Sequence, residues 1–141
     1  MLVQWVATAL IGCLTYVPGL CLKDGVQLNE KHMHPAMKQI VLVAQSTAPM
    51  LERGTVWITS ANDSIHHPES FHYKDQAYDI RIWNIIGAVS VEARAWAERM
   101  QVALGDDYDV LLERDHIHVE WDPEVVQDGY IFDGYDIRVG R

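Results

Sequence analysis

The hydrophobic positions of this chain follow two periods that alternate along the sequence. Apolar residues that return about every 3.6 positions predict a helix over residues 35–51, opened by a proline and ended by Gly54. The same period predicts a second amphipathic helix over residues 90–104, with Ser90 as its N-cap and Gly105 as its stop. These two segments are the expected helices of the fold.

Short segments between and after these helices are rich in β-branched and aromatic residues or alternate between apolar and polar ones, which is the pattern of strands. The expected strands cover residues 55–59, 77–83, 108–113 and 117–121, with a short one at 130–132. Turn-forming residues over 60–70 predict a surface loop between the first two. The order helix, strand, strand, helix, strand, strand predicts an α+β fold with helices packed against a mainly antiparallel sheet.

The first 22 residues are apolar and carry no charged side chain. Three interpretations of this segment stay open. It is a secretory or lipoprotein-type leader that lacks the usual positive start, a membrane anchor close to the minimum of ~20 residues, or an extension or first strand of the fold. We therefore expect an N-terminal segment, residues 1–22, then one folded domain, residues 23–141, with membrane contact only through the first.

The charge balance and the cysteine content limit which partners and which metal ligands this chain can use. Lys and Arg number 11 against 20 Asp and Glu, for a formal net charge of −9, and the basic residues form no cluster. This balance argues against a nucleic acid partner, because binding to phosphate backbones depends on basic clusters. The two cysteines, Cys13 and Cys21, both precede the folded domain, and the sequence leaves open whether they form a disulfide. Any metal in the domain must therefore be held by nitrogen and oxygen ligands.

Two histidine-containing segments supply such ligands. His72 precedes the strand that carries Asp79, and His118 lies on a later strand. Two imidazoles and one carboxylate make the ligand count of a catalytic zinc site, which keeps a fourth position open. His116 shares the face of His118, because strand residues two apart point to the same side. Asp115 lies three residues before His118 and offers a spare acid next to the site.

The spacing of these residues resembles that of a known superfamily. Ser-x-His-x6-Asp followed by Asp/Glu-x-x-His is the pattern of zinc D-Ala-D-Ala carboxypeptidases and phage L-alanyl-D-glutamate endolysins, which share the Hedgehog/D-Ala-D-Ala peptidase fold. The resemblance covers residues 56–122, and this segment is similar to small phage-type members of the superfamily. The matching residues are Ser70, His72, Ala77, Asp79 and His118.

The resemblance implies a function and a set of roles. We expect a zinc-dependent peptidase that hydrolyses an amide bond in peptidoglycan stem peptides and works with a phage or at the cell envelope. Zinc would be the cofactor, and Asp115 or His116 would move the proton. Independently of the resemblance, strand alternation places Arg81, two residues after Asp79, on the same face, where its guanidinium would hold a substrate carboxylate bidentately. Ser64 and Ser70, in the loop, would line the peptide groove.

The chain departs from the family pattern at the residue that decides catalysis. The general base of the family is commonly glutamate, and this chain has Asp115 there, one methylene shorter. Relatives with a His-x-His pair use its first histidine, which is His116 here. The sequence therefore offers two candidates for one role. A zinc-bearing module without catalysis and a metal-free phage structural domain stay open as alternatives.

Overall fold

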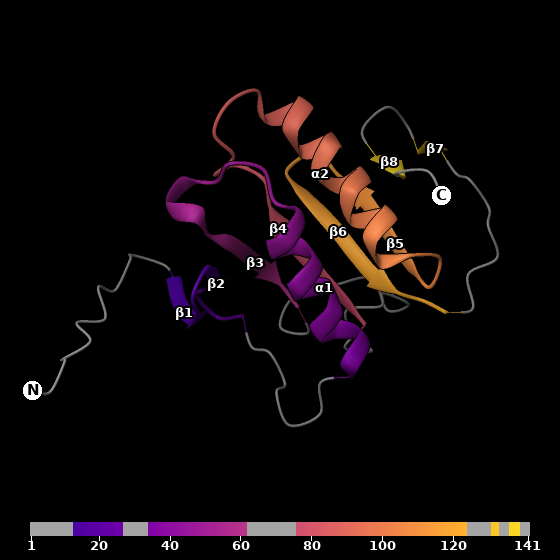
Figure 1. Ribbon diagram of the computed structural model, residues 1–141, viewed down its shortest axis with the longest axis horizontal. Coiled ribbons are helices and arrows are strands. Elements are labelled where there is room, and N and C mark those ends of the chain that lie inside the picture. Colours follow the sequence, from indigo (N-terminus) through magenta and orange to yellow (C-terminus); the bar gives the residue numbers. More distant parts are fainter. Residues whose placement is uncertain (1–12, 27–33, 62–75, 124–130, 133–135, 139–141) are drawn as a thin grey trace, which may run out of the picture.

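The computed structural model describes residues 13–26, 34–61, 76–123, 131–132 and 136–138. Eight strands form one sheet in the order β1-β2-β3-β4-β6-β5-β8-β7, and two helices accompany it (Figure 1). The strands are β1 Cys13–Val17, β2 Leu20–Lys23, β3 Val56–Ser60, β4 Ala77–Arg81, β5 Tyr108–Leu112, β6 His116–Trp121, β7 Ile131–Phe132 and β8 Asp136–Arg138. The helices are α1 Pro35–Thr47 and α2 Val89–Leu104, and a 3-10 turn spans Glu52–Gly54.

The sheet is mainly antiparallel, as the sequence predicts. Among the described strands, β2 and β3 form the parallel pair, and the remaining neighbours run antiparallel. β4 and β6 lie in the middle of the sheet, and their register places Asp79 opposite His118 and Arg81 opposite His116. The α+β class is confirmed.

Both helices cover the same face of the sheet, with the core between them (Figure 1). α1 contributes Ile40 and α2 contributes Trp96, and neither side chain is exposed. Ile80 of β4 and both Ile117 and Val119 of β6 point into this core. Because strand side chains alternate between faces, the residues between them point to the other side of the sheet. We call this other side the histidine face; it carries Trp57, Asp79, Arg81, His116, His118 and Glu120.

The end of the first helix differs from the prediction. α1 stops at Thr47, and Ala48, its C-cap, has an extended ψ of 142°. Pro49 explains this, because a proline disfavours the helical conformation of the residue before it. Gly54 closes the 3-10 turn rather than the helix. Leu51 continues the apolar spacing without being helical. Its side chain is buried, and its backbone forms an isolated β-bridge with Ile85.

The second helix is confirmed, but its predicted N-cap is wrong. α2 begins at Val89 after Ala88, which makes no side-chain capping hydrogen bond, and Ser90 lies inside the first turn. The prediction of Gly105 as the stop is confirmed. Its φ of 84° lies in the region that glycine adopts without strain, and its N–H donates to the carbonyl of Gln101.

Part of the apolar N-terminal segment belongs to the sheet. Leu20, Cys21 and Leu22 of β2 are buried, and β2 pairs with β3. Cys21 is disulfide-bonded. Within the described residues, no helix is long and apolar enough to cross a membrane. At the other end of the chain, β7 corresponds to the strand expected at residues 130–132, whereas β8 was not expected from the sequence.

Replacing Trp96 by phenylalanine is expected to lower the free energy of unfolding by about 2–4 kcal/mol. The indole Nε1 of Trp96 donates to the carbonyl of Ala44, 3.2 Å away, and so joins α2 to α1. The smaller ring would lose this bond and leave a cavity. Urea unfolding measures the change. Val102→Ala, on the same helix at an 83% exposed position, should change stability by less than about 0.5 kcal/mol. An equally small effect of Trp96→Phe would contradict this packing.

Candidate metal centre

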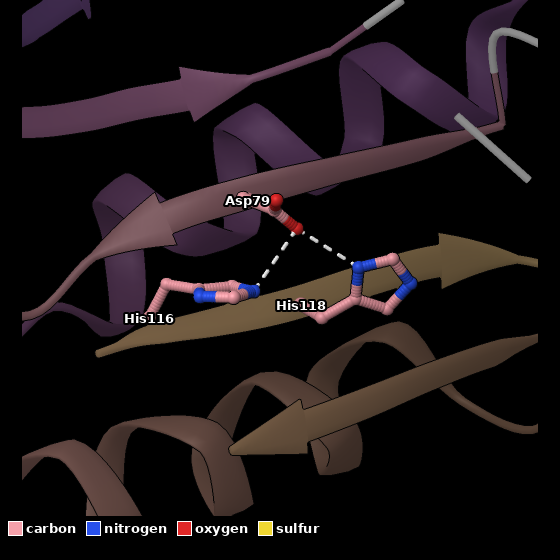
Figure 2. A group of neighbouring side chains, drawn as sticks. All are labelled: Asp79, His116 and His118. Atoms are coloured by element: carbon pink, nitrogen blue, oxygen red, sulfur yellow. Dashed lines mark hydrogen bonds and ion pairs between the residues drawn. The ribbon is translucent and has the colours of Figure 1, made fainter. Parts of the chain in front are cut away.

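Three potential ligand side chains meet on the histidine face. Asp79 projects from β4, and His116 and His118 project from β6 beside it (Figure 2). The antiparallel register brings Asp79 directly opposite His118, and the period of two along β6 puts His116 on the same face. All three side chains are largely shielded from solvent, with exposures of 13%, 21% and 15%.

The donor atoms of these residues have the spacing that one metal ion needs. The Nδ1 of His118 lies 2.9 Å from Oδ1 of Asp79, and the Nε2 of His116 lies 3.4 Å from the same oxygen. All three donor atoms lie within 4.8 Å of one another. Tetrahedral zinc with bonds of about 2.0–2.1 Å separates neighbouring ligand atoms by ~3.3 Å. This cluster, Asp79 with His116 and His118, could therefore bind a metal ion.

A carboxylate supports each histidine from the side away from Asp79. Oε2 of Glu120 lies 3.0 Å from Nε2 of His118, and Oδ1 of Asp115 lies 2.7 Å from Nδ1 of His116. Metal-binding histidines commonly use their second nitrogen in this way, which fixes the ring orientation and raises its basicity. The arrangement therefore suits ligation through the nitrogens that face Asp79.

Two further carboxylates at the site, Glu113 and Glu120, lie outside the motif seen in the sequence. Alternation along β6 contains a signal for Glu120, because it lies two residues after His118 on the same face. Glu113 has no such signal, because it follows β5 in the turn to β6. There its N–H donates to the carbonyl of His116 at 2.9 Å, and its Oε2 lies 3.1 Å from Nε2 of the same residue.

These carboxylates keep both imidazoles cationic when no metal is bound. Burial alone would lower the pKa of each histidine, but the acidic neighbours outweigh it. Hydrogen bonding to Glu113 and Asp115 and the charge of Asp79 raise the pKa of His116 from 6.5 to about 9. Hydrogen bonds to Asp79 and Glu120 raise the pKa of His118 to about 10. Both side chains are therefore protonated at neutral pH in the metal-free protein.

The affinity for zinc is expected to rise by at least about tenfold per pH unit between about pH 6 and pH 8. The pKa of His118 is raised to about 10, so this ligand must release a proton throughout that range before it can bind a metal. Metal therefore competes with protons less well at the lower pH. Calorimetry in buffers of different ionisation enthalpy measures the protons released. A pH-independent affinity would contradict ligation by His118.

The structure brings together some of the sequence-predicted residues and leaves others undescribed. Asp79, His118 and His116 meet, whereas His72, Ser64 and Ser70 lie outside the described residues. Asp115 is 62% exposed and contacts His116. The two candidates for one catalytic role are thus in contact with each other.

The remaining predicted residue, Arg81, lies next to the cluster. It is opposite His116 in the β4–β6 register, and its guanidinium Cζ is 4.2 Å from the centre of the Trp57 ring. At the other end of the same strand pair, Trp121 stacks on His34, the N-cap of α1, with 4.1 Å between ring centres.

Comparisons of this chain with protein-family models, with curated proteins and with solved structures find no match.

Proposed function

We propose that this protein is a zinc-dependent peptidase that hydrolyses an amide bond in peptidoglycan stem peptides. The observation that carries the proposal is the contact of one carboxylate, Asp79, with two imidazoles on one face of a sheet. The peptidoglycan substrate follows from the motif resemblance. The arrangement of two helices on one face and the histidines on the other supports the proposed Hedgehog/D-Ala-D-Ala peptidase-like fold.

In this proposal Asp79 and His118 are zinc ligands, and His72 is the third. Imidazole nitrogen and carboxylate oxygen are ligands that zinc accepts, and three protein ligands leave a position for water or substrate. When bound, zinc would polarise the scissile carbonyl as a Lewis acid and lower the pKa of a bound water to about 7.

His116 is the group that moves the proton. Its Nε2 lies beside Asp79, where a water activated for attack on the amide would be within reach. A metal ion bound to Asp79 would offset one of the negative charges that raise the pKa of His116 and so favour its neutral form. The neutral imidazole accepts the water proton and passes it to the leaving amine. Asp115 holds the ring by the opposite nitrogen, Nδ1. The two residues thus act as a pair in which Asp115 orients His116.

Digestion of purified peptidoglycan tests this function. The zinc-loaded protein is incubated with wall material, and the released amino and carboxyl termini are identified by mass spectrometry. We expect new termini of one kind, which disappear with a chelator and return with added zinc. The Asp79→Asn variant serves as the inactive control. Zinc-loaded protein that releases no termini from wall or from soluble stem peptides would overturn the proposal.

A second function, a zinc-bearing binding or phage structural module without catalysis, is favoured by one observation. His116 completes a three-donor set with Asp79 and His118, and the set needs no residue outside the described part of the chain. In that arrangement His116 is a structural ligand rather than a proton carrier. The metal content of the His116→Gln variant distinguishes the two functions.

A further inference from the structure

One cation next to the metal cluster has no acidic partner among the described residues. The two histidines of the cluster are surrounded by the carboxylates Asp79, Glu113, Asp115 and Glu120, each of which contacts at least one of the two imidazoles. Arg81 lies directly opposite His116, yet none of the ion pairs in the described part of the chain includes it. Its guanidinium lies over the indole of Trp57 instead.

This contact leaves the hydrogen-bonding edge of Arg81 available. A guanidinium that stacks on an aromatic ring uses its face, whereas its N–H donors project from its edge in the plane of the group. Trp57, on β3, is itself partly buried, so the platform is fixed by the sheet. The stack holds a flexible side chain in one place before any ligand arrives, which lowers the entropy cost of binding. An arginine held in this way suits an anion with two parallel acceptors, and a carboxylate is such an anion.

The position of Arg81 sets how far the anion lies from the metal cluster. Arg81 follows Asp79 by two residues on the same face of β4, a separation of about 7 Å along the strand. One or two residues of an extended peptide span ~3.5–7 Å. When the scissile amide of a peptide lies at Asp79 and the histidines, a carboxylate one or two residues along the peptide from that amide would therefore reach Arg81.

We infer that Arg81, supported by Trp57, is the binding site for a free carboxylate of a peptide, one or two residues from the amide bond at the metal cluster. Cleavage of the amide at the metal cluster rests on the proposed function, whereas binding of the carboxylate to Arg81 does not. The carboxylate comes from the C-terminus of a short peptide or from an acidic side chain. In either case the protein selects substrates with a free acid near the cleaved bond and discriminates against long, uncharged peptides.

Binding without turnover tests the site directly. The probes are N-acetyl-D-alanine, which has a terminal carboxylate, N-acetyl-D-glutamic acid α-amide, which has a side-chain carboxylate, and N-acetyl-D-alanine amide, which has neither. The readout is the indole N–H resonance of Trp57, assigned by its loss in Trp57→Phe. We expect both acids to shift this resonance and the amide to leave it unchanged. The acid that binds more tightly shows whether the natural carboxylate is a peptide C-terminus or an acidic side chain. A shift that is equal for acid and amide would overturn the inference.

Variants of the arginine complete the test. Arg81→Gln should weaken binding of the acids by about 10- to 100-fold, and Arg81→Lys, which keeps the charge but not the planar fork, by less. Arg94→Gln, on the exposed surface of α2, removes the same charge elsewhere and should leave binding unchanged. If Arg94→Gln weakens binding as much as Arg81→Gln does, net charge rather than a site is responsible, and the inference fails.

Kinetics separate this inference from the proposed function. Arg81→Gln should retain its zinc and raise KM for a free-acid peptide by the same 10- to 100-fold, with a smaller change in kcat. With a C-terminally amidated peptide, wild type and variant should be alike. Carboxylate binding without hydrolysis of any peptide would refute the peptidase and leave the carboxylate site standing. Hydrolysis that is indifferent to Arg81 would do the reverse.

Discussion

The substitution Asp79→Asn is expected to abolish metal binding. The oxygen of Asp79 contacts both imidazoles, so its loss removes one ligand and the negative charge beside His118, a second ligand, and beside His116. Asparagine has the same shape, and the fold should be kept. We expect zinc content to fall from about one equivalent to under about 0.1, and affinity to fall by more than about 100-fold. Metal analysis after dialysis and a competition titration with a chromogenic chelator measure both quantities.

Glu120→Gln provides the matched control. It makes the same chemical change on the same face, but Glu120 contacts His118 through the nitrogen that faces away from Asp79. Loss of a carboxylate in that supporting position costs about 10- to 100-fold in metal affinity, so the variant should still bind zinc at saturating concentrations. Thermal unfolding of both variants checks that each is folded. Full zinc content in Asp79→Asn would remove this residue from the ligand set.

The substitution His116→Gln is expected to separate metal binding from turnover. If His116 carries the proton, the variant keeps about one equivalent of zinc and loses hydrolysis by about 10²- to 10⁴-fold, the range for removal of a general acid–base group. His72→Ala, at the sequence-predicted third ligand, should instead lose the metal. Metal analysis and the rate of stem-peptide hydrolysis are measured on the same preparations.

Asp115→Asn adds a control for the role of His116. It leaves the imidazole in place but weakens the bond at Nδ1, so activity should fall less than in His116→Gln while zinc is kept. A His116→Gln variant that loses zinc, together with a His72→Ala variant that keeps it, would place His116 among the ligands. That result would favour the non-catalytic module.

Much of the fold could be predicted because local patterns and tertiary structure agree. The apolar stripe of α2 and the alternation in β4 and β6 are visible in the sequence, and the core uses these same residues. The prediction was wrong where a neighbour overrode the period. Leu51 continues the helical spacing beyond α1, but Pro49 ends the helix and Leu51 is buried by other means. β8 is three residues long and depends on pairing with β5 and β7, which no local pattern specifies.

The site was predictable to the extent that it follows strand alternation. Asp79 and His118 were expected to converge, and the register of β4 and β6 places them opposite each other. Sequence spacing treated Asp115 and His116 as rivals, because it carries no information on the direction of a turn residue. Glu113 was missed for the same reason: it reaches His116 only because the turn after β5 folds back.

The alternation of β6 also limits how this protein can change. Ile117 and Val119 point into the core, and His116 and His118 point to the opposite side, so the strand encodes two functions in interleaved positions. Deletion or insertion of one residue within β6 would move the side chains that follow it to the opposite face, so that apolar residues would lie on the metal side and a histidine in the core. Homologues and designed variants should therefore keep the spacing of His116 to Val119 within this strand. New metal specificity should be sought by substituting side chains on the histidine face, because a change in the length of β6 would also disrupt the core.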